Sequence, residues 1–131
     1  MGKPVLVLDF DGVVHSYTSG WEGADVVSDP PVPGAIEFIQ TALQRLDVCI
    51  FSSRSGQDGG ILAMRSWLWR HAGRQIPANV DHWTNEVRFP AEKPAAFLTI
   101  DDRAITFDGA WPDVDVLLDF KPWNKRGGPA A

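Results

Sequence analysis

The residues from Val5 to Leu8 constrain the fold of this chain more than any others. Four consecutive aliphatic residues are typical of a short strand that is buried on both faces, as in a parallel sheet. Asp9 and Asp11 follow at once, and Gly12 lets the chain turn sharply. Because ligands bind beyond the carboxyl ends of strands in open α/β sheets, chemistry is expected at these carboxylates. Two like charges so close repel each other unless a cation or a proton lies between them, so the pair indicates a metal site.

The rest of the chain predicts strands that alternate with helices, which is the pattern of an α/β fold with a parallel sheet. Strands are expected over residues 5–9, 48–51 and 96–100, with shorter ones over 80–83 and 104–107. Helices are expected over residues 35–46, 61–71 and 114–120. The segment 15–33 is rich in Gly, Ser, Asp and Pro and predicts a loop or small flap, and a polar, solvated tail is expected from about residue 121.

Length and composition limit the classes of protein and partner. At 131 residues the chain predicts a single domain, 1–131. The net charge of −5 argues against a general nucleic-acid-binding surface. With no signal-peptide pattern and no stretch as long as a transmembrane helix, we expect a cytoplasmic protein without a membrane partner. Cys49, the one cysteine, lies in an apolar run and is expected in the core. The sequence does not indicate an oligomeric state.

Polar residues follow three of the expected strands, as the pairs Asp9/Asp11, Ser52/Ser53 and Asp101/Asp102. The carboxyl ends of parallel strands joined by right-handed crossovers lie at one edge of the sheet, so the three pairs are expected in one site. A lone Asp-x-Asp is common, and the specific signal is the combination of all three.

In these residues the chain resembles the haloacid dehalogenase (HAD) superfamily of phosphohydrolases, over essentially its whole length. The matching segments are Asp9-Phe10-Asp11-Gly12-Val13-Val14, Ser52 in Ile50-Phe51-Ser52-Ser53, Lys93, and the acidic pair that ends Leu98-Thr99-Ile100-Asp101-Asp102. The resemblance implies a Rossmann-like three-layer sandwich around a central parallel sheet. The places where this superfamily inserts cap domains are short here, which implies a capless or nearly capless protein with an open site.

The resemblance also implies an activity, the Mg²⁺-dependent hydrolysis of phosphate monoesters. Asp9 would attack phosphorus and form an aspartyl-phosphate, which divides one difficult step into two easier ones. Asp11 would protonate the leaving oxygen and then deprotonate the water that hydrolyses the intermediate. The substrate would be a phosphorylated small molecule or macromolecule.

The remaining site residues implied by the resemblance hold the metal and the phosphate. The Mg²⁺ ligands would be Asp9, the backbone carbonyl of Asp11, Asp101, and Asp102 either directly or through water. The phosphate-binding groups would be Ser52, Ser53, Lys93 and the backbone at Gly12. Lys93 is only a few residues before Asp101, so it would reach the site from a loop unless another lysine takes its role.

Plainer interpretations compete for each of these residues. Asp9 and Asp11 could cap a turn, and the pair at 101 and 102 could form salt bridges with Arg54 or Arg103. The Ser52 hydroxyl could bond its own turn, and Lys93 could be a solvated loop residue. We expect both arginines behind the site or at the surface, with contact to a substrate anion as the alternative.

Two residues of the flap, His15 and Trp21, are candidate substrate contacts. Large aromatic side chains dominate small cores, so five tryptophans are expected in packing positions: Trp67, Trp69, Trp83, Trp111 and Trp123.

Three other functions are considered. A receiver domain also uses aspartates, a hydroxyl residue, a lysine and Mg²⁺, but it carries the acidic pair on its first strand. A non-catalytic phosphate-binding or scaffold protein of the same fold is the main alternative, and the presence together of Asp9, Asp11, Ser52 and Asp101 argues against it. A metal-dependent nuclease is disfavoured by the small basic content.

Overall fold

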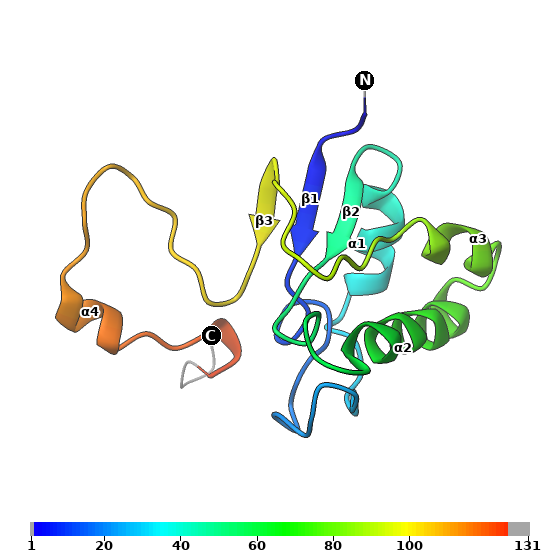
Figure 1. Ribbon diagram of the computed structural model, residues 1–131, viewed down its shortest axis with the longest axis horizontal. Coiled ribbons are helices and arrows are strands. Elements are labelled where there is room, and N and C mark those ends of the chain that lie inside the picture. Colours follow the sequence, from blue (N-terminus) through cyan, green and yellow to red (C-terminus); the bar gives the residue numbers. More distant parts are fainter. Residues whose placement is uncertain (1, 126–131) are drawn as a thin grey trace.

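A three-stranded parallel sheet forms the centre of the computed structural model, which describes residues 2–125 (Figure 1). The strands are β1 (Val5–Leu8), β2 (Asp47–Ile50) and β3 (Leu98–Ile100), in the order β2-β1-β3. Val7 of β1 lies opposite Cys49 on one side and Thr99 on the other. The three long apolar strands are therefore confirmed, and the protein has a mixed α/β fold. Cys49 is fully buried, as expected.

The described helices are α1 (Ala35–Ala42), α2 (Gly60–Gln75), α3 (Val80–Asn85), α4 (Val114–Leu118) and a 3₁₀ turn, Trp123–Lys125. Helix α1 packs against β2 and α2, and α2 packs against α3. Phe10, Ile36 and Trp67 are completely or almost completely buried in the core between these elements. Among residues 2–125, no helix is both long and apolar enough to cross a bilayer.

The two edges of the sheet differ. Beyond β2, Arg88 adds a single parallel bridge, with its N–H donating to Val48 O (3.0 Å) and its carbonyl accepting from Ile50 N (2.8 Å). Beyond β3, no backbone partner lies along the outer edge within residues 2–125. After β3 the chain leaves the sheet in a wide excursion that carries α4 (Figure 1).

Two predicted short strands are wrong. Residues 80–83 belong to α3, because Val80, Trp83 and Thr84 share one face of a helix at spacings of three and four residues. Thr84 Oγ1 also donates to the Val80 carbonyl within that helix (2.6 Å). Residues 104–107 have no regular secondary structure and pair with no strand of the described chain.

Of the five tryptophans predicted as core or packing residues, three lie outside the core. Trp67 and Trp83 are buried, whereas Trp69, Trp111 and Trp123 are 51%, 86% and 52% exposed. Trp69 lies two positions after Trp67 on α2, which turns its side chain toward solvent. The high aromatic content therefore does not all serve the core.

The expected solvated tail is only partly correct. Pro122 is buried, and Trp123 Nε1 donates to the Gly12 carbonyl (2.8 Å), so the chain returns to the loop after β1. Residues 126–131 of the predicted tail lie outside the described residues.

Candidate active site

Three carboxylates meet where β1 and β3 end. One oxygen from each of Asp9, Asp101 and Asp102 lies within 4.8 Å of the other two. The sheet causes this meeting, because Leu8 lies opposite Ile100 and the Asp9 N–H donates to the Ile100 carbonyl (2.9 Å). Residues more than ninety positions apart thereby share one site, and we call these three residues the acidic triad.

The acidic triad is electrostatically strained. Burial, a hydrogen bond with Asp102 and the charge of Asp101 raise the pKa of Asp9 to about 8, although Phe10 N–H donates to Asp9 Oδ1 (2.9 Å). Asp102 Oδ1 is buried and has no hydrogen-bond partner. Hard divalent cations prefer carboxylate oxygens, so a Mg²⁺ ion would satisfy that oxygen and offset the mutual repulsion. The residues present therefore fit the expected metal.

A small cavity of about 150 Å³ lies beside the triad. Its lining includes five of the predicted site residues: Asp9, Ser52, Ser53, Lys93 and Asp101. Lys93 reaches it from the irregular chain before β3, as the sequence suggested. One cavity thus combines carboxylates, hydroxyl groups and an ammonium group, which are the groups that a phosphate and its metal require.

Ser52 also bonds its own turn. Its hydroxyl accepts from the Arg54 N–H (3.0 Å), while its own N–H donates to Ser55 Oγ (3.0 Å). The plainer interpretation, that the Ser52 hydroxyl bonds its own turn, is therefore confirmed. Ser52 nevertheless also lines the cavity.

Gly12 is required by its surroundings. Its φ of +84° is left-handed, and a Cβ at this position would collide with the Asp102 carboxylate. Its N–H donates to the His15 carbonyl (2.8 Å), and its carbonyl accepts from Trp123. The loop after β1 is thus pressed directly against the acidic triad.

Asp11 does not join the triad. Its carboxylate accepts from His15 Nδ1 and from Arg54 Nε, both at 2.9 Å. Burial acts to raise the pKa of Asp11, but the hydrogen bonds from His15 and Arg54 outweigh it and leave the pKa below its ordinary value. Asp11 is therefore held as a carboxylate by contacts that lie outside the acidic triad.

Arg54 is fully buried behind Asp11, which is the first of its two expected places and not the surface. Besides its bond to Asp11, its Nη1 donates to the carbonyls of Gly23, Ala24 and Val26 at 2.9–3.0 Å. One guanidinium group thereby ties the flap over residues 15–33 to Asp11 in the loop after β1. Trp21, half exposed, stacks over that group at 4.9 Å rather than over the cavity.

His15 is also an internal residue and not a substrate contact, since it is only 1% exposed. The Asp29 N–H donates to His15 Nε2 (3.1 Å), so this nitrogen is an acceptor and Nδ1 carries the proton that is donated to Asp11. Sequence reasoning missed the contacts of both His15 and Arg54 with Asp11. Two features of the sequence could have indicated these contacts. His15 follows Asp11 by four residues, and Arg54 is the one charged residue in the serine-rich segment after the second strand.

Arg103 remains exposed, with its backbone N–H donating to Asp101 Oδ1 (2.8 Å). No side-chain salt bridge joins it to the acidic pair among residues 2–125.

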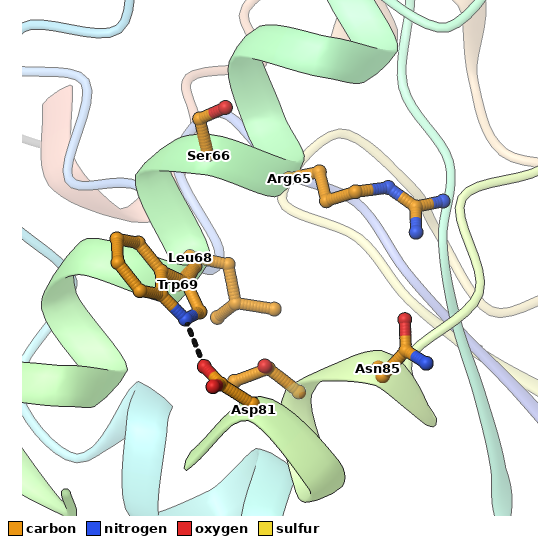
Figure 2. A pocket seen from close by; sticks show the side chains of 7 residues that line it. Arg65, Ser66, Leu68, Trp69, Asp81 and Asn85 are labelled. Carbon is orange, nitrogen blue, oxygen red and sulfur yellow. Dashed lines mark hydrogen bonds between the residues drawn. The ribbon is translucent and has the colours of Figure 1, made fainter.

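A second hollow, of about 270 Å³, lies between α2 and α3 and has none of the predicted site residues in its lining. Figure 2 shows Trp69 on its rim, with Nε1 donating to Asp81 Oδ1 (2.6 Å). Arg65 and Asn85 lie on the other side of the hollow, without a clustered set of reactive groups.

None of the protein-family models, curated proteins or solved structures compared with this chain matches it.

Proposed function

We propose that this protein is a Mg²⁺-dependent phosphatase of the HAD type, which hydrolyses phosphate monoesters through an aspartyl-phosphate. The observation that carries the proposal is the position of Asp9, which belongs to the acidic triad and also lines the cavity with Ser52 and Lys93. A nucleophile, a metal-binding group and phosphate-binding groups therefore meet within one small volume.

Each step can be assigned to residues of this chain. An Asp9 oxygen attacks phosphorus, and the bond from phosphorus to the ester oxygen breaks as the new P–O bond forms. Lys93, Ser52 and Ser53 line the cavity, and their ammonium and hydroxyl groups would offset the negative charge of the phosphoryl oxygens there. Mg²⁺ held by the acidic triad, together with the Asp11 carbonyl, would neutralise further charge there. Water then attacks the acyl phosphate, releasing inorganic phosphate and restoring Asp9.

Asp11 supplies the proton transfers in this proposal. The contacts with Arg54 and His15 favour its carboxylate form, which suits the removal of a proton from the attacking water. To act first as the acid, Asp11 must gain a proton and shift these two contacts when substrate binds. We therefore propose that Arg54 and His15 set the resting position of Asp11.

The Rossmann-like three-layer arrangement is part of the same proposal. The parallel strand order β2-β1-β3, with β1 in the middle, supports it. Arg88, which follows α2 and α3, pairs beyond β2, so right-handed crossovers place α1 and α2 on the same face of the sheet, where they pack against each other. No inserted cap domain interrupts the described chain between β1 and β3, so the proposed site is open to a small or large phosphorylated substrate.

The main alternative is a phosphate-binding or scaffold protein without catalysis. An assay of phosphate release from p-nitrophenyl phosphate distinguishes this alternative from a phosphatase. The wild type and Asp9→Asn are each measured with Mg²⁺ and with EDTA. We expect release that requires Mg²⁺ and is lost in Asp9→Asn, by roughly 10³-fold or more. Turnover by Asp9→Asn near the wild-type rate would exclude the covalent mechanism. Parallel assays with phosphometabolites and oligonucleotides would rank substrates and detect nuclease activity.

A further inference from the structure

The excursion after β3 exposes an unusual amount of apolar surface. Every residue from 103 to 119, which we call the arm, is exposed, and α4 packs appreciably on no other element of the described chain. Eleven of the sixteen large apolar side chains that are exposed lie between Phe97 and Trp123. Trp111 is 86% exposed and Leu118 is 79% exposed.

The arm is fixed at both ends, so this exposure is not that of a free terminus. At its start, β3 is hydrogen-bonded to β1 in register, and beyond its end Trp123 donates to the Gly12 carbonyl. Between these anchors the arm stands clear of the body of the protein (Figure 1). It borders an open hollow of about 710 Å³ whose lining includes Phe107, Trp111 and Leu117.

The rest of the chain also has an exposed apolar surface, which the arm of the same chain does not cover. Both Leu98 and Ile100 of β3 are exposed, and the outer edge of β3 has no partner in the described chain. Beside them lies a groove of about 270 Å³, whose lining includes Val13, Val32 and Phe38. An unprotected strand edge next to an apolar groove is a surface that soluble proteins usually cover.

We propose that a second copy of this chain covers these surfaces, with the arm of each protomer packed on β3 and the groove of the other. One chain thus has both a projecting apolar arm and an apolar groove. In a dimer with twofold symmetry, each arm packs on the groove of the partner, so that neither surface stays exposed.

The exposed area is sufficient for such a dimer. Four of the eleven side chains are aromatic, a kind that presents roughly 150–250 Å² each, and with the seven aliphatic side chains the exposed apolar area is on the order of 1,000 Å² per chain. A stable interface buries about 800 Å² per partner. The proposal concerns assembly only and does not depend on the proposed phosphatase activity.

The test is the molar mass of the full chain, measured by sedimentation velocity over a range of concentrations. We expect a dimer whose dissociation constant rises by at least about tenfold in Leu118→Glu, because a buried charge opposes the contact. Leu62→Glu is the matched control: Leu62 is 69% exposed on α2, away from the arm, and its substitution should leave the dimer intact. Far-UV circular dichroism checks that both variants fold.

A second experiment identifies the contact. Phe38→Cys and Leu118→Cys are made separately and mixed under oxidising conditions, with Cys49 buried and unreactive. A disulfide between the two different variants supports the exchanged arm. A monomer at every concentration would overturn the proposal. A disulfide that forms only within a Phe38→Cys/Leu118→Cys double variant, or a dimer indifferent to Leu118→Glu, would overturn it too.

Discussion

At the scale of single residues, the contact between Arg54 and Asp11 links the structure of the site to its chemistry. A fully buried guanidinium group holds the proposed acid–base carboxylate and three carbonyls of the flap. Removing it would leave a largely buried carboxylate with only His15 as a partner, together with unsatisfied carbonyl groups.

We therefore expect Arg54→Ala to lower the free energy of unfolding by about 3 kcal/mol or more, and to lower kcat as Asp11 loses its fixed position. Urea denaturation measures the stability. The matched control is Arg88→Ala, which breaks the half-exposed ion pair with Asp47 and should cost about 1 kcal/mol or less. An equal loss in the free energy of unfolding for the two variants would show that the buried contact of Arg54 stabilises the fold no more than an exposed ion pair does.

At the scale of elements, the turn between β2 and α2 positions Arg54. Helix α2 begins at Gly60, where a Cβ would collide with the Arg54 carbonyl. Gly56, in the same turn, has open space around its Cβ position and no left-handed φ.

Gly60→Ala should displace the Arg54 backbone, lowering the free energy of unfolding by about 1–3 kcal/mol and reducing the proposed phosphatase activity. Gly56→Ala provides the control, with a change within about 0.5 kcal/mol and normal activity. Thermal unfolding and phosphate release measure both effects. If Gly60→Ala behaved like Gly56→Ala, the close approach of α2 to Arg54 would not govern the site.

The same elements show what the sequence could predict. The apolar runs of β1, β2 and β3 identify a parallel sheet, and parallel ends bring the acidic triad together by topology alone. The sequence of α3 favours a strand because β-branched and aromatic residues suit strands, while its helical spacing covers less than two turns. The contacts that Arg54 and His15 make with Asp11 depend on the path of the flap, which local pattern does not encode.

At the scale of the whole molecule, the acidic triad links stability to pH and metal. The pKa of Asp9 is about 8 in the fold, against an ordinary value of 3.8, so the native state binds this proton more tightly than the unfolded chain. The stabilisation is complete below the unfolded pKa and is lost as pH rises through about 8. A Mg²⁺ ion at the proposed site would bind the deprotonated form and should reverse the loss.

We expect the Tm of metal-free protein to fall between pH 5 and pH 8 relative to that of Asp9→Asn, which lacks this proton. Mg²⁺ should raise the wild-type Tm more at pH 8 than at pH 5. Differential scanning calorimetry of the two proteins, with and without Mg²⁺, gives the four comparisons. A wild-type Tm that rises with pH relative to Asp9→Asn would contradict the raised pKa.

The central claim, a phosphoryl group carried by Asp9, can be observed directly. Asp11→Asn is incubated with p-nitrophenyl phosphate and Mg²⁺, since this leaving group needs no protonation while hydrolysis of the intermediate still needs a base. Acid quenching and peptide mass spectrometry should then find one phosphoryl group on the peptide containing Asp9, and none when Asp9→Asn is added. Phosphorylation at another residue, or turnover by the wild type with no phosphorylated enzyme in Asp11→Asn, would contradict the account.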